Sequence, residues 1–182
     1  MRMIKFASLV GAAVMACCIG TGTWAGASTG SLSVTSSVAQ TCTVSSASTL
    51  GFGAYDPVVA NAASALAGTG SVSLKCTKAS SLITIDLDAG GRVSTNQRRM
   101  VGASSGDFLN YNITQPATAA PWTSCAGNTT WGSTVGGSVY TPSGVTWSSL
   151  VAQAFTVCGS IPAAQNVPAD AYSDTVTVTV NF

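Results

Sequence analysis

Apolar residues alternate with Ser and Thr along most of this chain, and this period of two constrains the fold more than any other feature. Successive side chains of a β-strand point to opposite faces of its sheet, so an alternating segment predicts a strand with one buried face. The pattern is clearest in residues 70–76, 81–91, 108–113 and 172–182. In the last of these segments one face carries Val176, Val178, Val180 and Phe182.

Turn-forming residues separate the alternating segments. Gly, Pro, Asp and Ser gather at 55–57, 90–91, 105–107, 136–137 and 162–168. The Ala-rich stretch 58–66 is interpreted as a loop, and no segment has the pattern of a long amphipathic helix. Short strands at this spacing predict a single antiparallel, immunoglobulin-like β-sandwich.

The N-terminus has the pattern of an export signal. Two basic residues precede an apolar stretch and a group of small residues that ends at Ala27. We therefore predict a signal peptide over residues 1–27, with cleavage after Ala25 as the alternative. A lipoprotein signal at Cys17 and a retained N-terminal anchor are the other interpretations. Beyond residue 27 no apolar run approaches the ~18 residues that a membrane-spanning helix needs.

Two of the six cysteines lie in the predicted signal peptide. The exported chain keeps Cys42, Cys76, Cys125 and Cys158. An even number of cysteines in an exported protein predicts two disulfides, and four cysteines allow three pairings. The exported cysteines are far apart in the sequence and the chain has no His, which argues against a zinc site.

The chain offers little for catalysis. Only 7% of its residues are charged, and it contains neither His nor Glu. No His can therefore activate a serine. Asp86 and Asp88 could form a carboxylate pair or bind a hard cation, but a solvated strand face before a turn is the preferred interpretation. We predict no catalytic residue, no cofactor and no metal.

Charge and aromatic residues give two weaker binding hypotheses. The net charge is +1, so nothing indicates a nucleic-acid partner. Arg98 and Arg99 could hold an anionic sugar or phosphate, although an exposed edge that carries charge against aggregation is preferred. A sugar-stacking platform could use Trp122, Trp131 and Trp147, although tryptophans more often fill a core.

Four segments together resemble the spore coat protein U family. Residues 41–57 carry a Cys-Thr-Val strand and a Phe-Gly-x-Tyr-Asp-Pro turn, and residues 68–77 resemble the second cysteine strand. Residues 109–113 resemble the central Asn-Tyr-Asn strand, and 159–182 resemble the closing segment with its terminal Phe. The match covers nearly the whole exported chain, in order.

That family is similar to the pilins of archaic chaperone–usher pili. The resemblance implies an immunoglobulin-like sandwich, residues 40–182, that lacks its last strand. It implies three kinds of partner, namely a periplasmic chaperone, an outer-membrane usher and neighbouring subunits, and a location at the cell surface or outside the cell. The missing strand would come from residues 28–39 of a neighbour, and the C-terminal strand would border the acceptor groove.

Residues 28–39 themselves show the alternation that a donor strand needs. Leu32, Val34 and Val38 share one face, and Ser36 interrupts the row. The alternative is that this segment is the sandwich's own first strand.

We predict the disulfide pairs Cys42–Cys76 and Cys125–Cys158. Cys76 shares a strand face with Val72 and Leu74, so the first bridge is expected against the core. Cys158 alternates with Phe155 and Val157, so the second is expected to pin the loop 114–131 to the outer surface.

The function expected from these features is that of a structural pilus subunit, serving adhesion and biofilm formation. The alternatives are a tip or adaptor adhesin that binds a surface or glycan, and a secreted coat or matrix protein that forms no pilus. A secreted enzyme is disfavoured, because the chain lacks catalytic groups.

Overall fold

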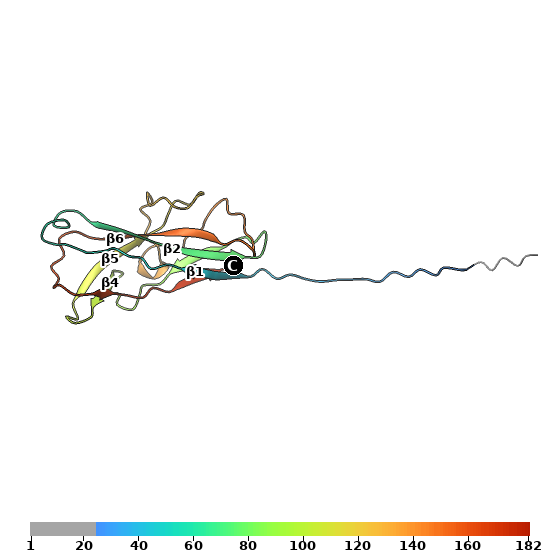
Figure 1. The fold of residues 1–182 in the computed structure, drawn as a ribbon, viewed down its shortest axis with the longest axis horizontal. Coiled ribbons are helices and arrows are strands. Elements are labelled where there is room, and N and C mark those ends of the chain that lie inside the picture. The colour runs from blue at the N-terminus through green and yellow to red at the C-terminus, as the bar shows by residue number, and fades with distance from the viewer. Residues whose placement is uncertain (1–24) are drawn as a thin grey trace, which may run out of the picture. The chain divides into compact units, whose positions relative to one another are not determined.

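The computed structural model describes residues 25–182, and this part of the chain is built from β-strands (Figure 1). The strands are β1 Cys42–Ala47, β2 Leu66–Cys76, β3 Thr84–Leu87, β4 Arg98–Gly102, β5 Phe108–Thr114, β6 Gln153–Ile161, β7 Tyr172–Ser173 and β8 Val178–Asn181. A single 3-10 turn, η1, spans Ser133–Val135. No helix within residues 25–182 is long and apolar enough to cross a bilayer. Most of the predicted signal peptide lies outside the described residues.

The chain divides into two units at residues 37 and 38. The first unit spans residues 1–37, and its described part, 25–37, contains no helix or strand. The second unit, Val38–Phe182, contains all the strands and begins two residues before the predicted start of the sandwich at Gln40.

Two antiparallel sheets make up the second unit. The larger sheet has the strand order β1-β2-β6-β5-β4-β7, and the smaller sheet pairs β3 with β8. The larger sheet curls, and the smaller sheet closes over the same core. The predicted class, an all-β antiparallel sandwich, is confirmed.

The alternating pattern accounts for the strands that face this core. Along β2 the side chains of Val72, Leu74 and Cys76 are buried, while those between them are half-buried. The same alternation appears in β3 and in β5, where Leu109 and Tyr111 are buried. The period of two in the sequence is therefore the period of core contacts.

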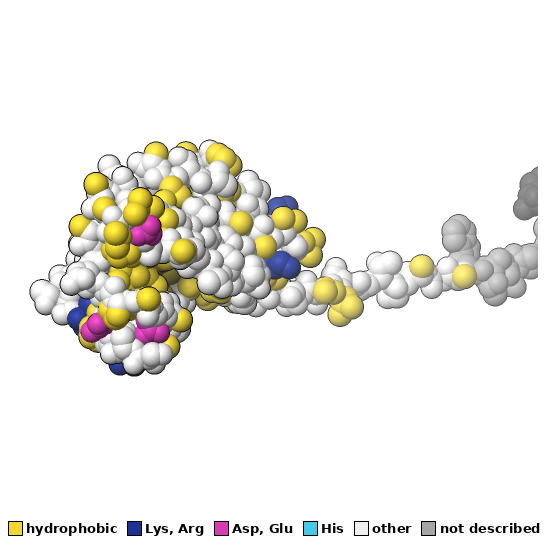
Figure 2. Space-filling model, turned by 60° about the vertical axis from the view of Figure 1, so that its left-hand side comes forward, with side chains coloured by type: hydrophobic (Ala, Val, Ile, Leu, Met, Phe, Trp, Pro, Cys, Tyr) yellow, Lys and Arg dark blue, Asp and Glu magenta, His cyan; other side chains and the backbone are white. Residues whose placement is uncertain are grey.

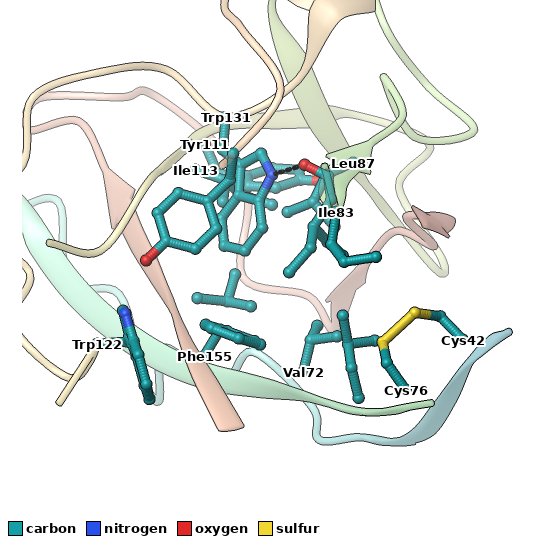
Figure 3. Close-up of a cluster of buried hydrophobic side chains, with 14 of the residues drawn as sticks. Cys42, Val72, Cys76, Ile83, Leu87, Tyr111, Ile113, Trp122, Trp131 and Phe155 are labelled. Carbon is teal, nitrogen blue, oxygen red and sulfur yellow. Dashed lines mark hydrogen bonds between the residues drawn. A yellow bond between two sulfur atoms is a disulfide. The ribbon is translucent and has the colours of Figure 1, made fainter. Parts of the chain in front are cut away.

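Aromatic side chains fill the middle of the core. The ring of Phe155 is fully buried, and its centroid lies 5.5 Å from that of Trp122 and 6.0 Å from that of Trp147. Trp131 is also fully buried and donates its Nε1–H to the Ile85 carbonyl at 2.9 Å (Figure 3). The three tryptophans thus pack in the core and form no exposed sugar-stacking platform.

The two disulfides have the predicted partners. Cys42–Cys76 joins directly paired residues of β1 and β2 and borders the core (Figure 3). Cys125–Cys158 ties the loop 114–131 to β6. The second bridge was expected at the outer surface. This prediction is wrong for Cys158, which is only 4% exposed. The loop that the bridge holds contributes Trp122 to the core.

Candidate functional site

Both sheets of the sandwich have strand edges without a ladder partner among the described residues. β1 pairs only with β2, and β8 pairs only with β3. β7, which precedes β8 in the same segment, pairs only with β4. β1 and β8 approach each other closely, but no ladder joins them. An unpaired strand edge presents free N–H and C=O groups that can pair with another strand.

A groove lies where the chain continues beyond β1 and where it passes from β7 into β8. One wall is formed by residues 47–52, and the other by the last segment of the chain, 172–178. Its volume is about 380 Å³, and its floor is mainly apolar: Val72, Leu87, Met100, Tyr111, Ile113 and Val157. A second cavity of about 810 Å³ continues the groove towards Val58 and Val167 and shares Leu50, Phe52, Met100 and Tyr172 with the first. Figure 2 shows hydrophobic side chains gathered in a hollow of the surface.

The first wall is positioned by a close approach of Phe52 to the sheet. Gly68 of β2 and Gly159 of β6 are paired across the ladder, and the Phe52 ring lies against both. A Cβ atom at Gly68 would come within 2.6 Å of both the ring and the Gly51 carbonyl oxygen. Two glycines at one register position therefore make the flat surface on which this aromatic side chain rests.

The second wall keeps the alternating pattern of the sequence. Its half-buried residues are the even-numbered ones, and its odd-numbered residues are exposed. Val176 and Val178 line the groove, as does Tyr172. Val180 and Phe182 were also expected at this edge. Val180 is half-buried and packs against the core, and Phe182 is 54% exposed. Neither Val180 nor Phe182 lines the groove.

One charged group interrupts the second wall. Asp174 accepts a hydrogen bond from the Tyr111 hydroxyl at 2.7 Å on Oδ2 and another from the Gly91 amide at 2.9 Å on Oδ1. Burial, and then the neighbouring Asp174 carboxylate, raises the pKa of Tyr111 well above its usual range. Tyr111 is therefore a neutral donor at all ordinary pH values. The carboxylate is held in place beside the groove by these two bonds.

Arg98 has a buried position that the sequence did not indicate. It was expected at an exposed edge, but it is only 2% exposed. Its guanidinium donates to the carbonyl oxygens of Leu87 at 2.8 Å and of Asp88 at 2.9 Å. Burial lowers the pKa of Arg98. The side chain therefore ties β4 to the end of β3. Arg99 is different, since it stacks over Phe108 with its guanidinium carbon 4.0 Å from the ring centroid.

Asp86 and Asp88, which the sequence allowed as a carboxylate pair, accept hydrogen bonds from different groups. Asp86 accepts hydrogen bonds from the amide and the hydroxyl of Ser133, and Asp88 accepts from the amides of Gly90 and Thr177. They fix loops and are not merely solvated, as the sequence had suggested. Within residues 25–182 no three His, Cys, Asp or Glu side chains come together as metal ligands would.

The predicted donor residues are fully accessible. Leu32, Val34 and Val38 are 87%, 85% and 83% exposed, and residues 28–39 form no strand in the structure.

The fold and the groove define a class: an all-β antiparallel sandwich with a mainly apolar groove in its surface. The chain belongs to the Spore Coat Protein U domain family, whose model matches residues 28–179. It is 34% identical over 169 residues to Protein U of Myxococcus xanthus, covering 87% of each chain.

Among solved structures, the chain is similar to the CsuC–CsuE chaperone–tip adhesion subunit pre-assembly complex from archaic chaperone–usher Csu pili of Acinetobacter baumannii. The identity is 21% and the TM-score 0.49, and the match covers 80% of this chain and 40% of the solved chain. At these values the likeness carries no argument about function.

Proposed function

We propose that this protein is a structural subunit of a surface pilus, assembled when residues 28–39 of one copy fill the groove of the next. The observation that carries this proposal is a matched pair of features within one chain. The groove offers a mainly apolar floor between residues 47–52, at and beyond the end of β1, and residues 172–178, which lead from β7 into β8. The N-terminal segment offers a row of exposed apolar side chains at alternating positions.

Insertion of this segment as a strand would fill the groove and bury the exposed apolar row at the same time. An inserted strand pairs its main chain with one or both groove edges and buries one face of side chains. Leu32, Val34 and Val38 would each contribute roughly 1.5–3 kcal/mol on burial. Together they would stabilise the contact by several kcal/mol, before the main-chain hydrogen bonds are counted.

The direction of the inserted strand decides whether a fibre forms. The chain enters the sandwich at Cys42, at the end where β8 finishes. A donor strand antiparallel to β8 leaves the groove at the opposite end, so unlike ends of two copies meet and the chain of subunits stays open. A parallel donor would bring like ends together and allow a closed dimer. A pilus therefore requires the antiparallel direction.

An unfilled groove is a hazard before assembly, because its free edges can pair with any exposed strand. The proposal therefore includes a periplasmic chaperone that covers the groove and an outer-membrane usher at which the neighbour's segment replaces the chaperone. Export through the periplasm to the cell surface follows from this route. Adhesion and biofilm formation are the roles that such a fibre would serve.

The test is co-expression of the exported chain with a chaperone and an usher, followed by electron microscopy and gel analysis of polymers. Deletion of residues 28–39 is expected to give a folded, chaperone-bound subunit that does not polymerise. Val34→Asp is expected to do the same, because it places a charge in an apolar groove. Thr35→Asp, on the opposite face of the segment, is the matched control and should still polymerise. Polymers from the truncated chain would disprove the proposal.

The family name favours a second candidate, a secreted coat protein that forms no fibre. Such a protein should be a stable, soluble monomer without any chaperone. The same expression experiment, run without the chaperone, separates the two functions.

A further inference from the structure

We propose that the inserted segment has one register, in which Ser36 of the donor lies opposite Asp174 of the acceptor. This inference rests on the proposed function and identifies how the groove selects its occupant. Its starting point is one charged residue in the groove lining and one hydroxyl residue in the donor row. Asp174 is the only charged side chain that lines the cavity between residues 47–52 and 172–178. Ser36 is the only hydroxyl residue in the row formed by Leu32, Val34 and Val38.

Antiparallel pairing of the two polar residues fixes every other pair. Directly opposite residues on neighbouring strands share a face, and successive in-facing residues are two positions apart. The resulting pairs are Leu32 with Val178, Val34 with Val176, Ser36 with Asp174 and Val38 with Tyr172. All three apolar donor residues then lie opposite apolar or aromatic residues that line the groove.

Other registers place an apolar side chain on the carboxylate. A shift of two residues in one direction brings Val34 opposite Asp174, and a shift in the other direction brings Val38 there. A parallel strand that keeps Ser36 opposite Asp174 would bring Leu32 opposite Asp170. A one-residue shift turns the apolar row out of the groove. The antiparallel register with Ser36 on Asp174 avoids each of these conflicts.

The chemistry of Asp174 explains why a hydroxyl is needed. Its two oxygens each accept one hydrogen bond, from Tyr111 and from Gly91. Each carboxylate oxygen can accept a second bond, and in the open groove water can supply it. An inserted strand removes that water. The Ser36 hydroxyl can donate to the carboxylate in its place, whereas an apolar side chain would leave a desolvated charge without compensation.

Cysteine pairs in assembled polymers test the register directly. Residues opposite each other have Cβ atoms about 4.5–5.5 Å apart, within reach of a disulfide after small adjustments, and diagonal neighbours lie about 7–8 Å apart. The exported full-length chain, co-expressed with its chaperone and usher, would carry Val34→Cys with Val176→Cys, or Val34→Cys with Val178→Cys. Intermolecular disulfides mapped by mass spectrometry are expected for the first pair, at least about tenfold more often than for the second.

A second variant tests the role of the hydroxyl. Ser36→Val adds apolar surface, so a purely hydrophobic groove would accept it better than Ser36. The register proposed here predicts the opposite: assembly at least about fivefold slower than the wild type, from the cost of an uncompensated buried charge. Ser37→Val, on the opposite face, is the matched control and should assemble at the wild-type rate.

The outcomes separate this proposal from the proposed function. Polymers that cross-link through residues 34 and 178, that show no preference between the two pairs, or that form faster with Ser36→Val, overturn the register and leave strand exchange intact. A wild-type chain that forms no polymer with its chaperone and usher overturns both. Cross-links through residues 34 and 176, together with slower assembly of Ser36→Val, support the proposal.

Discussion

At the scale of single residues, two glycines shape the first wall of the groove. Gly68 and Gly159 face each other across β2 and β6, and Phe52 and Leu50 pack where their side chains would be. Any Cβ at these positions displaces the side chains that border the groove. A methyl group in place of the glycine hydrogen atom is therefore expected to lower both the stability of the sandwich and its ability to accept a strand.

Gly68→Ala is expected to destabilise the sandwich by roughly 1–3 kcal/mol, because the new Cβ meets the backbone oxygen of Gly51 as well as the Phe52 ring. Gly51→Ala is the matched control, since a Cβ at Gly51 has no atom within 4 Å. Urea unfolding of the two purified variants measures the difference. Equal midpoints for both variants would show that Phe52 can move away without cost.

Single residues also show where sequence reasoning stops. The buried faces of β3 and β5 follow from alternation alone, as Ile85 and Tyr111 illustrate. Arg98 could not be placed in this way, because a charged residue is buried only when carbonyl oxygens elsewhere in the fold accept its hydrogen bonds. The glycine pair under Phe52 likewise depends on the register between β2 and β6, which no local pattern contains.

At the scale of elements, the last segment of the chain links the two sheets. β7 pairs with β4 of the larger sheet, and after four intervening residues β8 begins its pairing with β3. The alternation continues from 172 to 182 with a single interruption at Asp174, so the sequence predicts one strand and cannot show the change of partner. That change is what makes this segment one wall of the groove, and it explains why Val180 and Phe182 lie beyond the groove.

The start of this wall is held by a carboxylate and should therefore depend on pH. Asp170 accepts hydrogen bonds from the amides of Ser105 and Ser104 at 2.7 and 2.8 Å, and these bonds lower its pKa from 3.8 to about 2. A carboxyl with a lowered pKa in the folded state stabilises the fold above its unfolded pKa. That contribution is lost as the pH falls from about 4 towards 2.

Asp170→Asn removes this titration. The melting temperature of the wild type should fall more steeply between pH 4 and pH 2 than that of the variant, and the two should differ most above pH 4. Calorimetry across this range measures both curves. Parallel curves would show that the Asp170 carboxylate does not anchor the turn in solution.

At the scale of the whole molecule, the proposed function assigns to one chain both an acceptor groove and the segment that fills it. Under this proposal, the sandwich alone lacks the stability that an inserted strand would add. The proposed register also fixes which donor residue lies opposite the C-terminus. If Leu32 lies opposite Val178 on an antiparallel strand, then Ser28 lies opposite Phe182, the last residue of the chain.

A copy of residues 28–39 appended after Phe182 through a four-residue turn should therefore fill the chain's own groove. A short turn can join only antiparallel neighbours, so this design succeeds only with the direction and register proposed. With the original segment 28–39 deleted, the self-complemented chain is expected to be monomeric and to gain several kcal/mol in unfolding free energy, from burial of three apolar side chains. Size-exclusion chromatography and urea unfolding test both points. The same chain with the appended copy carrying Val34→Asp is the control and should keep the low stability of the open sandwich. An appended wild-type copy that gives no gain over this control would contradict the antiparallel insertion on which the fibre depends.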